Sequence, residues 1–141
     1  MLASQQGIPT NVVINLGTID MMQYFSTWEQ SFDVMWASVA DRPCVVYVTL
    51  VEVSGHPIGT AINAKIRQME AAHPNVRVYD WAADVFELSA AYLADPENVE
   101  PPLFDPVHPT STGTDAMTAG IRRALESCPA PSNVAAPLAS R

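Results

Sequence analysis

The sequence predicts an α/β fold in which helices cover a parallel β-sheet. Short apolar runs rich in β-branched residues alternate with longer segments whose apolar residues recur every three or four positions. The runs are nearly continuous, as in parallel strands whose two faces are both covered. The order strand, helix, strand, helix, strand is typical of right-handed βαβ units. We therefore expect a three-layer, flavodoxin-like sheet flanked by helices.

The first two strands are expected at residues 11–16 and 44–51, where valine and isoleucine dominate. Between them, the aromatic and apolar side chains of residues 24–39 recur at helical spacing. That spacing favours one buried helix face over a cofactor-binding platform.

The next helix and the third strand follow in the same order. Residues 61–72 are amphipathic, and Pro74 ends the helix that they predict. Residues 76–79, Val-Arg-Val-Tyr, form a weaker apolar run that predicts the third strand. A parallel sheet of at least three strands follows from this order.

The rest of the chain is predicted to form two helices with a loop between them, followed by a tail. Residues 81–93 suit a helix, whereas the prolines of residues 94–104 deny that stretch regular hydrogen bonding. A last helix is expected at residues 113–126, where Thr112 and Asp115 have the spacing of a capping box. We expect one domain over residues 1–128 and a disordered tail, rich in proline, alanine and serine, over residues 129–141.

Composition excludes several classes of function. Fifteen acidic against seven basic residues give a net charge of -8, which repels a phosphate backbone, so no nucleic-acid partner is expected. No apolar run approaches the roughly 20 residues of a membrane helix, so no membrane segment is expected in this chain. The first residues lack the basic and apolar regions of a signal peptide. The chain as given is expected to be soluble.

The two cysteines, Cys44 and Cys128, are too far apart in sequence for a CxxC site. Cys44 opens an apolar run and is expected to be a buried thiol. A bridge to Cys128 is also compatible with the sequence, which leaves the pairing open.

Two segments carry candidate functional residues. Loops beyond the carboxyl ends of strands hold the functional sites of open α/β sheets, and Gly17 follows the first strand. Asp105 and His108 each precede a proline, just before the last helix, which stiffens the segment. A carboxylate three residues before a histidine can accept the Nδ1–H and leave Nε2 free as a base.

These segments resemble blocks of the SGNH (GDSL-type) esterases and acyl hydrolases. Residues 12–20, Val-Val-Ile-Asn-Leu-Gly-Thr-Ile-Asp, are similar to the family's strand and G-x-N-D loop. Residues 105–113, Asp-Pro-Val-His-Pro-Thr-Ser-Thr-Gly, are similar to its D-x-x-H-P-T-x-x-G block. Residues 76–81 resemble the version of the domain that is attached to some bacterial O-acyltransferases. The similarity covers roughly residues 11–125.

The resemblance implies ester hydrolysis, with His108 as general base, Asp105 as the residue that orients it, and Gly17 beside the oxyanion site. Ile19 stands where the family has an asparagine that donates to the oxyanion, and the loss of one such donor costs about 10²–10³ in turnover. The family's Gly-Asp-Ser nucleophile block and its oxyanion-glycine block do not occur before Gly17. The resemblance therefore implies a hydrolase fragment that lacks the first strand or strands of the fold, and this chain alone is predicted to be inactive.

No serine of the chain is expected to replace the missing nucleophile. Ser4 has no preceding strand, and Ser111 follows His108 too closely to face its Nε2. Ser54 lies on the loop after the second strand, where the sequence supplies no base for it.

Two further hypotheses stay open: a degenerate, non-catalytic relative that serves as a binding or scaffold module, which Ile19 favours, and an unrelated α/β domain with an accidental match. A sheet without the family's first strand exposes an apolar edge, which invites self-association.

No cofactor is expected. No metal is expected either, because Asp20, Asp105 and His108 match no known ligand spacing. If the protein is active, its expected partner is its substrate, a small acyl ester. If the chain belongs to a longer acyltransferase-like or secreted precursor, an extracytoplasmic location is expected.

Overall fold

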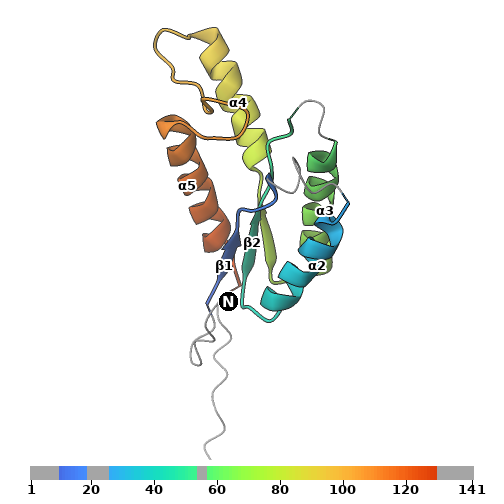
Figure 1. Cartoon of the computed structure of the whole chain (residues 1–141). Helices are drawn as coiled ribbons and strands as arrows, with labels where there is room; N and C mark the ends of the chain where they lie inside the picture. The colour runs from blue at the N-terminus through green and yellow to red at the C-terminus, as the bar shows by residue number, and fades with distance from the viewer. Residues whose placement is uncertain (1–9, 19–25, 54–56, 130–141) are drawn as a thin grey trace, which may run out of the picture.

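The computed structural model describes residues 10–18, 26–53 and 57–129. In this part of the chain three parallel strands form one sheet in the order β1-β2-β3, and helices flank it (Figure 1). The predicted α/β class with a parallel sheet is confirmed. The strands are β1 (Val12–Ile14), β2 (Val45–Val48) and β3 (Val76–Tyr79), and the helices are α2 (Trp28–Val39), α3 (Ile58–Ala72), α4 (Trp81–Ala94) and α5 (Ser111–Glu126).

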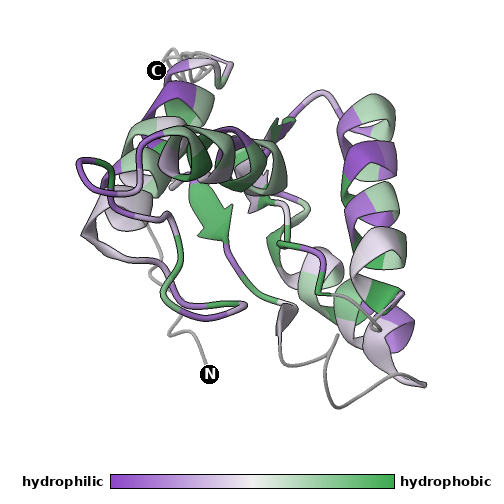
Figure 2. Ribbon diagram, turned by 90° about the horizontal axis from the view of Figure 1, so that it is seen from above, coloured by the Kyte–Doolittle hydropathy of each residue, from purple (hydrophilic) through white to green (hydrophobic). Residues whose placement is uncertain are grey.

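The central strand β2 is buried along its whole length because both of its faces are covered. Alternate side chains point to opposite faces of a strand. Val45 and Tyr47 join the core beneath α2 and α3, whereas Val46 and Val48 join the core beneath α4 and α5. Figure 2, seen from above, shows helices on two sides of the sheet. The sheet therefore lies between two helical layers, as the continuous apolar run predicted.

The strands end sooner than predicted, except β3, which covers the predicted residues 76–79. β1 pairs with β2 through three residues, from Val12↔Val45 to Ile14↔Tyr47. The backbone then turns at Gly17, where φ is +115°, a value that side-chain-bearing residues rarely adopt. The other edge of β1 pairs with no strand among the described residues, and the predicted self-association through it stays a prediction.

The helices agree with the predictions in position but not at every end. α3 begins three residues before the predicted start, and α4 extends one residue beyond its predicted end. The capping box predicted at Thr112 is wrong, because the N-cap of α5 is Thr110, whose side chain accepts from the Gly113 amide at 3.3 Å. Residues 24 and 25 of the predicted helix, and residues 130–141 of the predicted tail, lie outside the described residues.

Cys44 and Cys128 form a disulfide, with their Cα atoms 5.7 Å apart. The expectation of a free thiol at Cys44 is therefore wrong, although the residue is buried as predicted. The bridge joins the start of β2 to the residues just after α5, which return to the same end of the sheet. The sequence could not show this return, because 84 positions separate the two cysteines.

Candidate active site

The loops that follow the strands meet at one end of the sheet around a cavity of about 180 Å³. Asn15 and Thr18 line it from the loop after β1, and Val107 and Pro109 line it from both sides of His108. Residues from both candidate segments therefore line one cavity at this end of the sheet. The rest of the wall comes from the residues after β2, from the first residue of α4 and from α5: Thr49, Leu50, Val51, Trp81 and Met117.

Asp105 and His108 form the predicted pair. Asp105 Oδ2 lies 2.7 Å from His108 Nδ1, while Oδ1 accepts hydrogen bonds from the backbone amides of Val107 (2.9 Å) and His108 (2.8 Å). These bonds, from Val107 first and then from His108, hold the pKa of Asp105 below its ordinary value. The carboxylate therefore stays ionised and fixes the orientation of the imidazole.

The imidazole of His108 is mostly exposed, and Phe104 stacks on it with 5.5 Å between ring centroids. Nε2 makes no hydrogen bond to the part of the chain that the structure describes. A ring that is held at Nδ1 and open at Nε2 can act as a general base. No sequence pattern indicated the role of Phe104, since a single aromatic residue in a loop has no periodicity.

A short antiparallel bridge holds the segment that carries His108. Leu103 pairs with Pro109, and the Phe104 amide donates to the His108 carbonyl at 3.2 Å. The Thr110 amide donates to the Pro102 carbonyl at 3.0 Å. The segment is thus a tight turn that Phe104 and His108 close from opposite sides.

Gly113, the last position of the D-x-x-H-P-T-x-x-G block, has a structural reason to be glycine. A Cβ atom there would lie 2.0 Å from the Pro102 carbonyl oxygen and 3.1 Å from Pro109 Cβ. Absence of a side chain lets the turn lie against the first turn of α5. Gly113 therefore helps to position His108 without touching it.

Glu100 fastens the same segment to the start of α5. Its Oε2 accepts from Ser111 Oγ at 2.7 Å and from the Thr112 amide at 2.9 Å. These contacts, the Ser111 hydroxyl first, lower the pKa of Glu100 to about 2. Because the Ser111 hydroxyl is engaged by Glu100, Ser111 is unsuited to replace a nucleophile, as expected.

The replacement Glu100→Gln is expected to weaken the acid dependence of stability. The folded-state pKa of about 2 lies below the ordinary value of 4.5, so the ionised Glu100 stabilises the fold above pH 4.5. This stabilisation is lost as the pH falls from 4.5 towards 2. We expect the variant to take up about one proton fewer on unfolding in that range.

Urea unfolding of both proteins at several pH values between 2 and 6 measures this uptake. Glu97→Gln is the matched control, because Glu97 accepts no hydrogen bond from the described residues. Equal pH dependence of the parent chain and Glu100→Gln would contradict the prediction.

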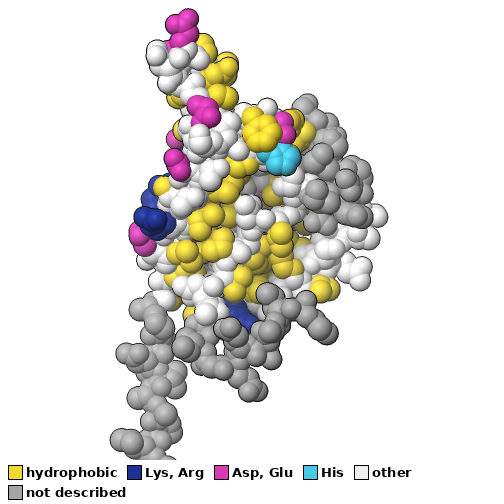
Figure 3. Space-filling model, turned by 60° about the vertical axis from the view of Figure 1, so that its left-hand side comes forward, with side chains coloured by type: hydrophobic (Ala, Val, Ile, Leu, Met, Phe, Trp, Pro, Cys, Tyr) yellow, Lys and Arg dark blue, Asp and Glu magenta, His cyan; other side chains and the backbone are white. Residues whose placement is uncertain are grey.

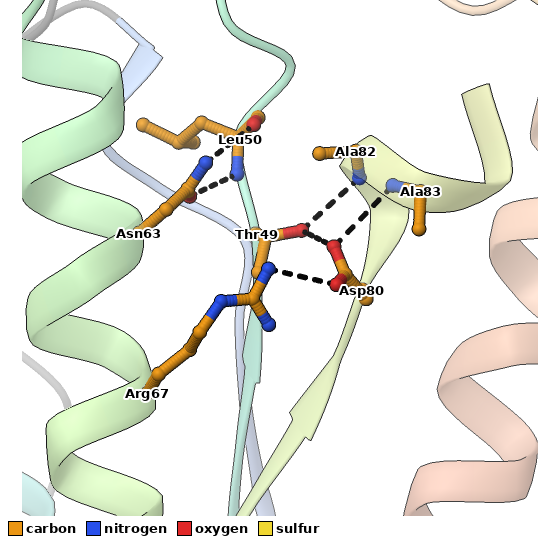
Figure 4. A network of polar contacts seen from close by, with 7 residues as sticks. All are labelled: Thr49, Leu50, Asn63, Arg67, Asp80, Ala82 and Ala83. Carbon is orange, nitrogen blue, oxygen red and sulfur yellow. Dashed lines mark hydrogen bonds and ion pairs between the residues drawn. The ribbon is translucent and has the colours of Figure 1, made fainter. Parts of the chain in front are cut away.

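A polar network fixes the strand ends that form part of the cavity wall (Figure 4). Asp80 accepts from Thr49 Oγ1 at 2.9 Å and from Arg67 Nη2 at 2.8 Å. Partial burial raises the pKa of Asp80, but the hydrogen bonds from Arg67 and Thr49 outweigh it and lower the pKa overall. Asn63 bonds both the amide and the carbonyl of Leu50. These groups satisfy one another, so their role is to hold β2, β3 and α3 in register.

Gly17 lies at the predicted place, at the end of β1. Its φ of +115° favours glycine, whereas a Cβ atom there would come within 3.2 Å of Leu50 Cδ1, which a small shift of the leucine side chain would relieve. Gly17 itself lines a different, apolar cavity, whereas Asn15 and Thr18 on either side face the cavity near His108. Ile19, Asp20, Ser4 and Ser54 lie outside the described residues, so the predicted loss of an oxyanion donor at Ile19 stays a prediction.

Figure 3 shows a histidine and hydrophobic side chains together on one face, with acidic side chains along the projecting end of the molecule. The projecting part comprises α4 and the loop after it (Figure 1).

Within the described ranges, no group of three His, Cys, Asp or Glu side chains is placed to hold a metal ion. None of the helices in those ranges has both the length and the hydropathy that crossing a membrane requires.

Comparison of the chain with protein-family models, with curated proteins and with solved structures finds no match.

Proposed function

We propose that this chain carries the His–Asp part of the active site of an SGNH-type ester hydrolase. The observation that carries the proposal is the 2.7 Å contact between Asp105 Oδ2 and His108 Nδ1, beside a cavity at the carboxyl end of a parallel sheet. Ligands of open α/β sheets bind at such ends. The resemblance of residues 12–20 and 105–113 to SGNH blocks supplies the reaction class.

In the proposed reaction, His108 Nε2 takes the proton of a serine hydroxyl while the serine oxygen attacks the carbonyl of an acyl ester. Asp105 stabilises the imidazolium that forms. The imidazolium returns the proton to the leaving alcohol, and water then releases the acid from the acyl-serine by the same route. No cofactor takes part, and the substrate class is a small acyl ester.

The nucleophile of this proposal belongs to a segment that precedes the printed sequence. The complete domain would be flavodoxin-like, with further parallel strands beyond β1. Among the described residues the second edge of β1 pairs with no strand, which supports this, as do Val13 and Leu16, which are 38% and 66% exposed. A strand added there would end beside the loop that contains Gly17 and would bring a serine to the cavity.

The Cys44–Cys128 disulfide supports an extracytoplasmic location for such a longer protein. Disulfides form and persist in oxidising compartments and are rare in the cytosol.

The printed chain by itself is expected to hydrolyse p-nitrophenyl acetate no faster than background, since no serine within residues 10–18, 26–53 and 57–129 hydrogen-bonds to His108 Nε2. The assay is release of p-nitrophenol by the purified, oxidised chain. Stoichiometric labelling of any one serine by a fluorophosphonate probe, Ser4 and Ser54 included, would contradict this expectation.

The same frame translated upstream of Met1 is expected to encode a strand followed by Gly-Asp-Ser, and the extended chain is expected to gain esterase activity. His108→Gln in the extended chain should lower turnover by at least about 10³-fold, because the serine loses its base. His73→Gln is the matched control, since His73 lies at the end of α3, with its ring 4.6 Å from that of Trp36. A stop codon directly upstream, or an inactive extended chain, would overturn the proposal.

A degenerate, non-catalytic binding or scaffold module is the second candidate, and Ile19 is the observation that favours it. An isoleucine cannot donate to an oxyanion, so an extended chain that folds but stays inactive supports this function. Restoring the donor with Ile19→Asn distinguishes the two candidates, because turnover should rise only where a working nucleophile is present.

A further inference from the structure

The helix α4 is apolar on two opposite sides, and only one of them is covered by the rest of the described chain. On the covered side Trp81 and Val85 are buried, and Leu88 and Tyr92 are half-buried. These four residues recur every three or four positions, so they share one face of the helix. Trp81 and Val85 belong to the core between the sheet and α5. This side therefore attaches α4 to the domain.

The opposite side of α4 is an exposed apolar stripe. Ala83, Phe86, Ala90 and Leu93 also recur every three or four positions, and all four are exposed. Phe86 and Leu93 are each 77% exposed, the highest values among the large hydrophobic residues that the structure describes. They stand two helical turns, or about 10 Å, apart along the helix. We call these four residues the α4 stripe.

The α4 stripe has the form of one half of a helix–helix contact. A helix that is apolar on all sides is normally buried, whereas α4 projects from the rest of the molecule (Figure 1). Single exposed apolar residues are common on protein surfaces, but an aligned set is typical of an interaction site. Ala90, between the two large side chains, leaves room for a side chain of an opposing helix.

The surroundings of the α4 stripe are acidic. Glu87 borders the stripe, Asp95 and Glu97 follow its end, and all three are exposed. None of them pairs with a cationic side chain in the described ranges, and no lysine or arginine occurs between Arg77 and Arg122. Figure 3 shows acidic side chains beside hydrophobic ones on this projecting part. The net charge of -8 makes a second copy of the chain a repelled partner, so the complementary partner is cationic.

We propose that the α4 stripe docks a basic amphipathic helix of another protein. The apolar face of that helix covers Phe86 and Leu93, and its lysine or arginine side chains pair with Glu87 and Asp95. Burial of the apolar side chains supplies the affinity, and the acidic border selects the sign of the partner's charge. No residue of the α4 stripe lines the cavity near His108, so docking is independent of the proposed hydrolase function.

The probe that tests the proposal is a synthetic basic helix made of two repeats of Leu-Lys-Lys-Leu-Leu-Lys-Leu. One control peptide has glutamate in place of every lysine. A second has the same composition in an order that gives it no apolar face. Dissociation constants for the oxidised chain are measured by fluorescence anisotropy of labelled peptide, at low and at high ionic strength. Amide chemical shifts of the parent chain locate the bound peptide independently of any variant.

Two pairs of variants separate this surface from general attraction between opposite charges. Phe86→Ser/Leu93→Ser removes the large side chains of the α4 stripe, and Glu87→Gln removes one charge beside it. Their matched controls are Val34→Ser and Glu29→Gln, because Val34 and Glu29 are exposed on α2, which packs on the other face of the sheet.

We expect Phe86→Ser/Leu93→Ser to bind the basic peptide at least about tenfold more weakly than the parent chain, because two large apolar contacts are lost. Glu87→Gln should bind about twofold more weakly at low ionic strength and equally at high ionic strength, since an exposed ion pair is weak and screened by salt. Both α2 variants should bind as the parent chain does. The shifts should gather at Ala83 and Ala90, and neither control peptide should bind.

Four outcomes would each overturn the proposal. The basic peptide does not bind, or it binds Phe86→Ser/Leu93→Ser as tightly as the parent chain. The glutamate peptide binds as well as the basic one. The parent chain forms a dimer in sedimentation equilibrium that Phe86→Ser/Leu93→Ser dissociates, which would make a second copy of the chain the occupant of the α4 stripe.

Discussion

Loss of the Cys44–Cys128 disulfide is expected to lower the free energy of unfolding by about 3–5 kcal/mol, the largest effect of any change considered for this chain. The bridge closes a loop with a sequence separation of 84, and its removal lets the unfolded chain explore many more conformations. Small domains are stable by only about 5–15 kcal/mol, so this is a large share of the total. The bridge also ties α5, and with it the segment that carries His108, to the central strand.

Urea unfolding of the oxidised chain, the reduced chain and the double variant Cys44→Ala/Cys128→Ala measures this effect. Alanine is chosen because Cys44 is completely buried and a serine there would add an unpaired hydroxyl. The reduced chain and the double variant should agree with each other. An oxidised chain that is no more stable than the reduced one would contradict the prediction.

The replacement Gly120→Ala is expected to lower the free energy of unfolding by about 1–3 kcal/mol, although alanine favours helices by about 1 kcal/mol over glycine. A Cβ atom at Gly120 would lie 2.0 Å from Cε2 and 2.2 Å from Cζ of Tyr79. The ring of Tyr79 is held in place, because its hydroxyl donates to Asp84 at 2.7 Å. Relief of the clash therefore moves α5 away from the sheet or breaks that hydrogen bond.

A double-mutant cycle with Tyr79→Val tests the cause of this loss. Valine lacks the ring atoms that the new Cβ would meet, so Gly120→Ala should be neutral or stabilising in that background. Ala119→Gly is a control for helix propensity, because Ala119 is exposed on the same helix. Stabilisation by Gly120→Ala in the parent chain would show that α5 does not pack on Tyr79 as described.

The predictions from sequence that were confirmed are those that depend on local pattern. β3 has the predicted bounds because polar residues follow and precede a short apolar run. The Asp105–His108 contact was predictable because three residues of proline-stiffened chain leave the two side chains little choice of distance. The N-cap of α5 was placed two residues too late, since Thr110 and Thr112 are equally good caps by residue type.

The sequence by itself determined the α/β class, the parallel order of the strands and the pairing of Asp105 with His108, because hydrophobic periodicity and short-range spacing encode them. Only the tertiary structure decided the disulfide, the contact of Gly120 with Tyr79, and the two cavities. These features join residues that are far apart in the chain, and their contacts depend on how the helices pack on the sheet. No local pattern carries that information.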